Sequence, residues 1–255
     1  MKKVILASPK LFHVSRLTSH VSRLMKKHPR ILPLSFYQRP DVLTIAKELI
    51  GKVLVTNWEG KKTTGRIVET EAYAGEIDRA SHAFKGITPR TEVIFGEGGR
   101  AYVYLCYGIH QMFNIVTNVK GVAHAILIRA VEPMEGIDIM LERTGKKKLD
   151  HTLTRGPGNV GKAFGFHTSQ CYTLLTDEKL FIADDGFNVP GENIITSPRI
   201  GVDYAGEHAA WHYRFYLGGN PYVSGKKIST QIGARKNISS KEISRKDARG
   251  KRRNN

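Results

Sequence analysis

The sequence predicts a single α+β domain in which a mainly antiparallel sheet is flanked by helices. Three observations carry this prediction. Residues 40–51 have helical spacing of apolar side chains, several later segments have the apolar pattern of strands, and strands and helices do not alternate regularly along the chain. A parallel sheet would require that alternation, because each crossover between parallel strands is usually a helix.

The helix over residues 40–51 is the first element. Asp41 follows Pro40 and offers a side-chain oxygen to the first free backbone N–H groups of a helix. Gly51 then provides a residue suited to a helix end. The apolar positions between them recur at helical spacing: Val42, Leu43, Ile45, Ala46, Leu49 and Ile50.

Two strands are expected next, over residues 52–56 and 64–70. Both segments are rich in β-branched residues, and the polar turn around Glu59 and Gly60 separates them. Their closeness in the chain makes an antiparallel hairpin the natural pairing.

A second hairpin is expected around Gly108. Residues 101–107 alternate aromatic and apolar side chains, and residues 110–116 follow the glycine as a second strand-like segment. Residues 123–131 form a mainly apolar run, which indicates a buried strand. The middle of the chain is therefore mostly sheet.

The net charge of +17 is concentrated at the two ends of the 255-residue chain. Residues 1–32 hold eight Lys or Arg and no acidic residue, and residues 226–255 hold eleven Lys or Arg against Glu242 and Asp247. Residues 33–225 are therefore close to neutral. We expect a folded catalytic domain over 33–225, a basic low-complexity extension before it and a basic flexible tail after it. Basicity alone indicates affinity for polyanions, not an activity.

The N-terminal segment contains a short duplication. His-Val-Ser-Arg-Leu occurs at 13–17 and again at 20–24. Two copies are too few for a repeat architecture, so this is either a low-complexity extension or an organelle-targeting peptide.

The cysteines and the apolar runs indicate a protein of the cytoplasm. Cys106 and Cys171 are the only cysteines, and neither has a neighbouring metal-ligand spacing. No apolar run approaches the roughly 20 residues that span a bilayer. We expect no metal, no cofactor and no membrane partner.

Residues 156–163 resemble a phosphate-binding loop but depart from it in two ways. Ala163 stands where the pattern needs a hydroxyl for Mg²⁺, and residues 150–155 before the loop lack the pattern of a buried strand. The Pro157-Gly158 pair also resembles the turn of a helix-hairpin-helix motif. Phosphate contact through backbone amides and a plain Gly-rich helix start both remain open.

Carboxylates and aromatic residues share one face of the predicted strand that ends near Tyr73. Glu69, Glu71 and Tyr73 lie two residues apart, so a strand points their side chains the same way. Such a face suits acid–base chemistry beside a stacking platform, although a solvated strand face has the same pattern. The tyrosines at 102, 104 and 107 likewise fit either a binding site or ordinary packing.

Taken together, these motifs resemble the alkyladenine, or mammalian-type 3-methyladenine, DNA glycosylases. The resemblance covers residues 34–224. It rests on Gly-Arg-Ile-Val-Glu-Thr-Glu-Ala-Tyr at 65–73, Ala-Ser-His at 80–82, Thr-Pro-Arg at 88–90, Tyr-Val-Tyr at 102–104, Tyr-Gly at 107–108, Asn-Ile at 114–115, Leu-Ile-Arg-Ala-Val-Glu-Pro at 127–133, Arg-Gly-Pro at 155–157, Arg-Ile-Gly-Val at 199–202, Ala-Gly-Glu at 205–207, Arg-Phe-Tyr at 214–216 and Pro-Tyr-Val-Ser at 221–224.

The resemblance implies a curved antiparallel sheet similar to the carboxy-terminal domain of formyltransferases, with a protruding hairpin that inserts into DNA. It also implies that Glu71 deprotonates the hydrolytic water and that Arg129 helps to hold this water. A nearby guanidinium favours the ionised form of a carboxylate, which is consistent with a base at neutral pH.

The resemblance further assigns the residues that handle the damaged base. Tyr73, His82 and Tyr104 match the positions that enclose an extruded base, and Asn114 matches the one that crowds the amino group of guanine. Tyr107 matches the hairpin-tip residue that fills the gap left in the duplex.

The function expected from this resemblance is base excision repair. The protein would flip alkylated or deaminated purines, namely 3-methyladenine, ethenoadenine and hypoxanthine, out of double-stranded DNA and hydrolyse the N-glycosidic bond without a lyase step. We expect a monomer located in the cytoplasm, or with the nucleoid in a prokaryote.

Two rival interpretations remain open from the sequence. One is a nucleic-acid-binding module of the same fold without catalysis. This interpretation does not explain why a carboxylate, Glu71, lies beside the stacking platform. The other is a helix-hairpin-helix glycosylase with Asp184 or Asp185 as the catalytic carboxylate.

Overall fold

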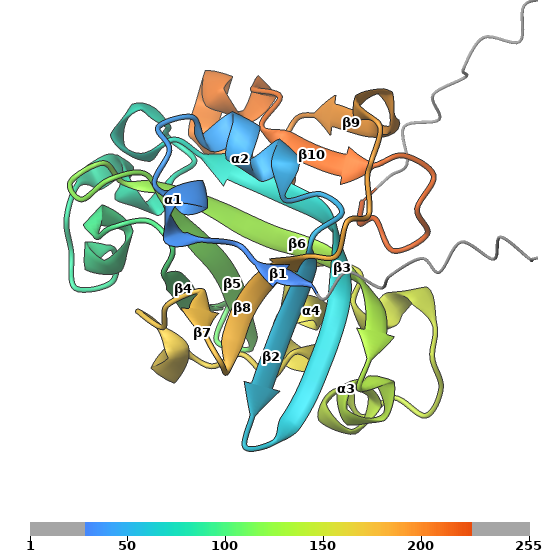
Figure 1. Ribbon diagram of the computed structural model, residues 1–255. Coiled ribbons are helices and arrows are strands. Elements are labelled where there is room, and N and C mark those ends of the chain that lie inside the picture. The colour runs from blue at the N-terminus through green and yellow to red at the C-terminus, as the bar shows by residue number, and fades with distance from the viewer. Residues whose placement is uncertain (1–28, 226–255) are drawn as a thin grey trace, which may run out of the picture.

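The computed structural model describes residues 29–225 (Figure 1). The expected basic extension and tail fall almost wholly on residues 1–28 and 226–255, which lie outside the described residues. The sheet begins slightly before residue 33, because Arg30 and Ile31 pair with Asp184 and Ala183.

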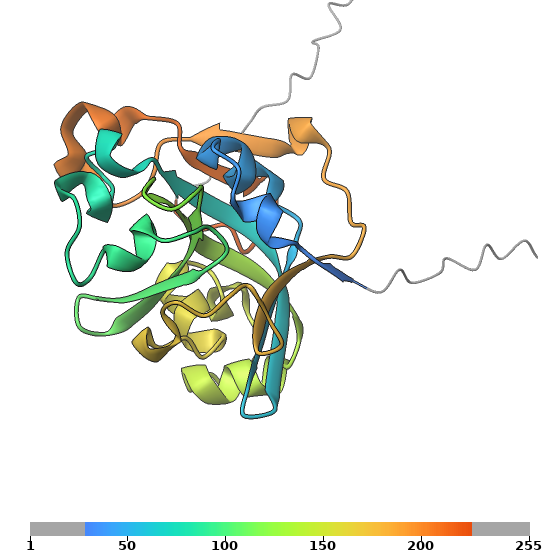
Figure 2. The same cartoon turned by 60° about the vertical axis from the view of Figure 1, so that its left-hand side comes forward.

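The described region is an α+β domain built on one mainly antiparallel, curved sheet, which confirms the predicted fold class (Figures 1 and 2). Its central order is β1-β8-β2-β3-β6-β5-β4, and β10 pairs with both β3 and β9. The strands are β1 (Arg30–Ile31), β2 (Val53–Trp58), β3 (Lys61–Tyr73), β4 (Ala101–Cys106), β5 (His110–Thr117), β6 (His124–Glu135), β7 (Thr176–Asp177), β8 (Leu180–Asp184), β9 (Ile194–Ser197) and β10 (Arg214–Leu217).

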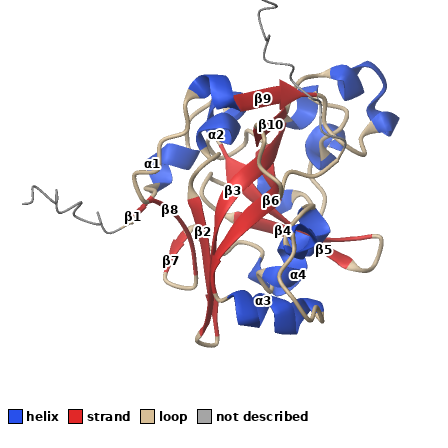
Figure 3. Ribbon diagram, turned by 90° about the vertical axis from the view of Figure 1, so that its right-hand side faces the viewer, coloured by secondary structure: helices blue, strands red, loops and turns tan. Residues whose placement is uncertain are grey.

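Within the part of the chain that the structure describes, four α-helices and several 3-10 turns surround this sheet (Figure 3). The α-helices are α1 (Leu34–Tyr37), α2 (Val42–Glu48), α3 (Ile137–Thr144) and α4 (Pro157–Ala163). Helix α2 packs on β3, β6 and β10, whereas α4 packs on β5, β6 and α3. The 3-10 turns are η1 (Gly75–Ile77), η2 (His82–Lys85), η3 (Glu92–Phe95), η4 (His151–Leu153), η5 (Thr168–Gln170), η6 (Gly191–Asn193) and η7 (Asp203–Ala210).

Helix α2 begins as its sequence predicts. The Asp41 carboxylate accepts hydrogen bonds from the backbone N–H groups of Leu43 and Thr44, which satisfies two of the free donors at a helix start. Gly51 follows the helix with a φ of 92°, in the left-handed region that favours glycine.

Both predicted hairpins are present. Strands β2 and β3 pair in antiparallel fashion around the turn at Glu59 and Gly60. Strands β4 and β5 pair from Ala101 opposite Ile115 to Cys106 opposite His110. The β4–β5 hairpin projects from the body of the molecule (Figure 3).

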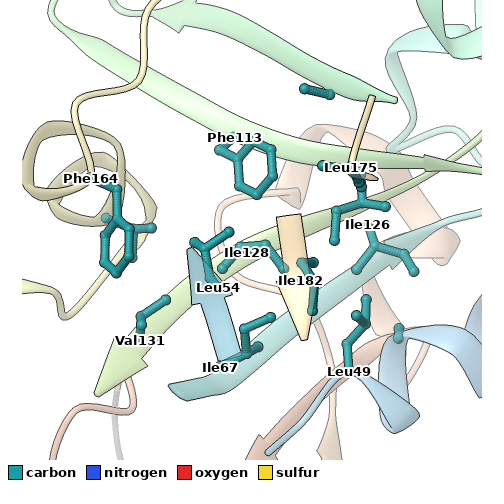
Figure 4. Close-up of a cluster of buried hydrophobic side chains, with 14 of the residues drawn as sticks. Leu49, Leu54, Ile67, Phe113, Ile126, Ile128, Val131, Phe164, Leu175 and Ile182 are labelled. Atoms are coloured by element: carbon teal, nitrogen blue, oxygen red, sulfur yellow. The ribbon is translucent and has the colours of Figure 1, made fainter. Parts of the chain in front are cut away.

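The hydrophobic core lies against the sheet and its covering helices (Figure 4). Phe113 of β5 stacks on Phe166 with ring centroids 4.1 Å apart. The fully buried side chains in this cluster include Leu49, Leu54, Ile67, Ile126, Ile128, Phe164, Leu175 and Ile182. Strands β3 and β6, which carry Glu71 and Arg129, therefore pack against this core.

Within residues 29–225, no helix is long and apolar enough to cross a bilayer.

Candidate active site

A cleft of about 830 Å³ opens where β3, β4, β6, η2 and η7 meet. It continues inward to a small cavity of about 40 Å³ beside Asn114. Six of the seven site residues expected from the sequence line these two spaces: Tyr73, His82, Tyr104, Tyr107, Asn114 and Arg129. The seventh, Glu71, is buried and hydrogen-bonds three residues that line the cleft.

The Glu71 carboxylate is fully buried and held by three donors. Its Oε2 atom accepts hydrogen bonds from the Tyr73 hydroxyl at 2.9 Å and from Arg129 Nη1 at 3.2 Å. Its Oε1 atom accepts one from the backbone N–H of Ile200 at 2.7 Å. Since a carboxylate oxygen has two lone pairs, Oε1 retains the capacity to accept a hydrogen from water.

Glu69 supports this arrangement from the same face of β3, as the spacing of the two carboxylates predicts. Its Oε1 atom accepts hydrogen bonds from Arg129 Nε at 3.1 Å and from Arg214 Nε at 2.7 Å. Ser224 donates to Glu69 through its backbone N–H and its hydroxyl. Two buried carboxylates therefore balance two buried guanidinium groups.

Arg129 remains charged in this position. Burial lowers the pKa of its guanidinium, but the neighbouring carboxylates of Glu71 and Glu69 raise it by more, so the net shift is upward. The Tyr73 pKa is raised well above its ordinary value, first by burial and then by Glu71. Tyr73 is therefore a hydroxyl donor at neutral pH.

His82 forms an aromatic wall of the cleft together with Tyr102 and Tyr104. Its Nδ1 atom lies 2.9 Å from the Tyr102 hydroxyl, and its ring meets that of Tyr104 edge-on with centroids 4.6 Å apart. Burial, helped by the Arg90 guanidinium, lowers the pKa of His82 to about 4. The imidazole is therefore neutral at physiological pH.

Asn114 is fixed at the inner end of the site. Its Nδ2 group donates to the backbone carbonyls of Tyr102 and Met112 at 3.2 and 3.3 Å. Both hydrogens of the amide are therefore engaged, which holds the side chain in one orientation.

Tyr107 stands at the tip of the β4–β5 hairpin and is 89% exposed. Tyr107 and Gly108 have φ values of 50° and 71°, so consecutive residues of the loop adopt left-handed conformations. A positive φ is uncommon for a residue other than glycine. The turn places an aromatic side chain in solvent beside the cleft.

Two contributions to the site were not predicted. Ile200 acts through its backbone N–H, which has no signature in the sequence. Tyr204 lines both the cleft and the inner cavity, and its hydroxyl donates to the carbonyl of Ala80 at 3.0 Å. The sequence around Tyr204 contains no pattern that would place its side chain at the cleft.

The cleft is bordered by cations. Arg79, Lys85 and Arg90 line it together with Arg129, whereas no aspartate or glutamate of residues 29–225 does. This distribution differs from the near-neutral total charge of the domain and suits a polyanionic ligand.

Asp184 and Asp185 lie elsewhere, which removes the support for the helix-hairpin-helix interpretation. Asp184 pairs with Lys52 at 2.9 Å beside a separate groove, and Asp185 pairs with Arg66 at 2.8 Å. Neither carboxylate lines the cleft.

The segment resembling a phosphate-binding loop forms α4. It follows η4 instead of a strand, as the departures from the pattern indicate. Pro157 at its first turn borders the cleft, and Asn159 donates to the carbonyl of Arg155.

Among residues 29–225, no group of three or more His, Cys, Asp or Glu side chains is arranged to hold a metal ion.

Comparison with known proteins gives a consistent result. The family model described as methylpurine-DNA glycosylase matches residues 35–221. A protein of Myxococcus xanthus named "Putative 3-methyladenine DNA glycosylase" is 47% identical over 193 residues, which are 76% of this chain and 93% of that protein. Proteins of the same name from Chlamydia abortus and Methanocella arvoryzae are 44% and 43% identical, over 73% and 76% of this chain and 98% and 96% of their own lengths.

Proposed function

The chain belongs to the methylpurine-DNA glycosylase family, and from this premise we propose that it is a monofunctional glycosylase for alkylated and deaminated purines. Family membership identifies it as a DNA glycosylase of base excision repair, with DNA as its substrate. The proposal adds three lesions, 3-methyladenine, ethenoadenine and hypoxanthine, and a hydrolysis that uses Glu71 as the base.

The observation that carries the proposal is the environment of Glu71. Its carboxylate is fixed by Arg129, Tyr73 and Ile200, and both side chains among these partners reach the cleft surface. We propose that a water molecule at the cleft floor is held against this carboxylate, whose Oε1 atom accepts one hydrogen bond from Ile200 and retains a free lone pair. A positioned carboxylate that accepts a proton in the transition state typically accelerates a reaction by about 10² to 10⁴.

The reaction we propose is a direct displacement at the sugar C1′ atom. Water donates its oxygen to C1′ and a proton to Glu71, while the electrons of the C1′–N9 bond leave with the base. Purines that carry a ring cation depart readily because they leave as neutral molecules. Neutral lesions such as hypoxanthine require a proton as they depart.

Aromatic walls explain how one site accepts several lesions. We propose that Tyr73, His82 and Tyr104 enclose the extruded base, because stacking requires only the π-face that every purine has. Tyr204 borders the same space and is 69% exposed in the free protein, so it would be covered by an extruded nucleotide. We propose that the fixed Asn114 amide rejects guanine by crowding its amino group.

Tyr107 and the cationic border supply the contacts with the duplex. Extruding a nucleotide costs a few kcal/mol of stacking and pairing. We propose that the exposed Tyr107 ring offsets part of this cost by entering the vacated space. Arg79, Lys85 and Arg90 would contact the phosphates on either side of the extruded nucleotide.

We propose a monofunctional enzyme because the reacting region is occupied by a carboxylate and not by an amine. A lyase step needs an amine that bonds covalently to C1′. Among the lysines of the described region, Lys85 alone lines the cleft, and it lies at the exposed rim. Borohydride reduction with a lesion-containing duplex is expected to trap no adduct, and an adduct that disappears in Lys85→Ala would overturn this part of the proposal.

We further propose that the protein acts as a monomer, since the seven site residues expected from the sequence all come together within a single chain. Light scattering of the free protein and of its complex with a short damaged duplex would measure this directly. A 2:1 complex at saturation would contradict it.

The experiment that tests the proposed function uses purified protein and three duplexes, each with a single 3-methyladenine, ethenoadenine or hypoxanthine. Alkaline cleavage of the resulting abasic sites reports excision, and an undamaged duplex of the same sequence is the control. We expect product from the damaged duplexes alone. Product from none of them would refute the proposal.

A further inference from the structure

A separate buried ion pair, between Asp78 and Arg199, lies outside the network of Glu69, Glu71, Arg129 and Arg214. Arg199 Nη1 lies 2.5 Å from Asp78 Oδ2, and Arg199 Nη2 lies 2.8 Å from Asp78 Oδ1. Both side chains are fully buried. A bidentate pair without solvent contact is expensive to desolvate, so it requires further hydrogen bonds to persist.

Those further bonds join the pair to both sides of the cleft. Asp78 accepts hydrogen bonds from the backbone N–H groups of Ala74 and Ala80. Ala80 lies two residues before His82 in the chain. Arg199 donates to the carbonyl of Ala72 at 2.9 Å. Its neighbour Ile200 holds Glu71.

The pair also lies directly behind the stacking platform. The guanidinium carbon of Arg199 is 4.8 Å from the centroid of the Tyr73 ring. Tyr73 lines the cleft whereas Arg199 does not, so the guanidinium lies on the side of the ring turned away from the extruded base. A charge at this depth is poorly screened by solvent.

We propose that Asp78 is a specificity-determining positioning residue: its carboxylate cancels the charge of Arg199 behind Tyr73, so that the pocket accepts purines that carry a ring cation. This inference rests on the proposed function and names the substrate class that the pair controls. Asp78 acts through Arg199 and Tyr73 and does not touch the base.

The physical argument compares two classes of lesion. A cationic purine stacked on Tyr73 is stabilised by the negative face of the ring. An unbalanced guanidinium behind that ring would repel the same cation through a low-dielectric layer, by an amount that reduces affinity about tenfold. A neutral purine of the same shape would be almost unaffected. Charge balance behind the platform is therefore a condition for binding the cationic class.

The test measures affinities in a Glu71→Gln background, so that the duplex is not consumed. One duplex carries 3-methyladenine, which is a ring cation in DNA, and the other carries its uncharged isostere 3-deaza-3-methyladenine. The quantity of interest is the ratio of the two affinities. Asp78→Asn is expected to reduce the preference for the cation about tenfold.

Arg199→Gln provides the opposite change. It leaves the Asp78 carboxylate unbalanced but still bonded to two backbone N–H groups, so the preference for the cation is expected to increase. Asp78→Glu keeps the charge and is expected to keep the parent ratio, as is the double variant Asp78→Asn with Arg199→Gln. A purely structural disturbance would instead weaken both duplexes alike in both single variants.

Thermal unfolding of each variant shows that the protein is folded before binding is measured. If Asp78→Asn does not fold, Arg199→Gln still tests the inference by itself. This variant should increase the preference for the cationic lesion, whereas general structural damage would not increase it. Unchanged affinity ratios in folded single variants would overturn the inference and leave the proposed function intact. If the parent protein binds neither lesion more tightly than undamaged DNA, the proposed function fails and the inference fails with it.

Discussion

The floor of the cleft and the tip of the β4–β5 hairpin hold their functional side chains in opposite ways. At the floor, Glu69, Glu71 and Arg129 are buried and joined by ion pairs that fix each atom. At the tip, Tyr107 extends into solvent from a short loop. In the proposed function, the floor is preorganised for chemistry on one bond, whereas the tip is free to enter a DNA duplex. Substitutions at the floor should therefore affect folding as well as activity, and substitutions at the tip should affect DNA binding alone.

Glu69→Ala should produce the largest loss of stability. It removes the carboxylate that pairs with Arg214 and leaves Arg129 paired with Glu71 alone, and breaking a buried pair by removing one partner costs about 3–5 kcal/mol. Urea unfolding would measure the change in the free energy of unfolding. Glu142→Ala is the matched control, because its pair with Lys61 is exposed and should contribute under about 1 kcal/mol. Equal losses of unfolding free energy in the two variants would show that the ion pairs of the floor stabilise the protein no more than an exposed ion pair does.

His82, in the wall between floor and tip, should make stability depend on pH. Its pKa is lowered to about 4 in the folded protein, against about 6.5 in an unfolded chain. Between these values the unfolded chain binds the extra proton, so stability falls as the pH decreases from 6.5 toward 4, by roughly 2–3 kcal/mol. Unfolding of wild type and His82→Gln at pH 7.5 and 4.5 would isolate this contribution. An identical pH slope in both proteins would contradict it.

Tyr107→Ala should leave the unfolding temperature unchanged and weaken base flipping. Losing one stacked aromatic side chain costs about 1–3 kcal/mol, or roughly 5- to 150-fold in the flipping equilibrium. Ethenoadenine fluorescence in a duplex would report the extruded fraction, with Tyr107→Phe as the control that keeps the ring. A lower unfolding temperature would show that the tip is part of the folded core, contrary to the comparison.

Asp184→Ala should have the smallest effect. Asp184 and Lys52 form a partly exposed pair remote from the cleft, so stability should change by about 1 kcal/mol or less. The rate of excision should equal that of wild type. A large loss of activity in this variant would revive the helix-hairpin-helix interpretation.

The predictable parts of the molecule are those set by local sequence. The Asp41 cap, the turn at Gly108 and the common face of Glu69 and Glu71 all follow from neighbouring residues. The β4–β5 hairpin was predicted for the same reason, since the alternation of side chains and the glycine lie within sixteen residues, Ala101 to Val116.

The parts that escaped prediction depend on contacts between distant segments. Arg214 and Ser224 reach Glu69 across 145 and 155 residues of chain, and nothing near either residue indicates the pairing. Asp78 and Arg199 are likewise separated by 121 residues. Strand β1 is too short to show a periodic pattern, so its pairing with β8 appears only in the folded protein.

The most direct test of the central claim compares wild type with Glu71→Gln in single-turnover excision of hypoxanthine from a duplex. Glutamine keeps the shape of the side chain but cannot take the proton from water. The account predicts a rate reduced by about 10² to 10⁴ with the affinity for the damaged duplex retained. A rate within a few-fold of wild type would contradict the assignment of Glu71 as the catalytic base.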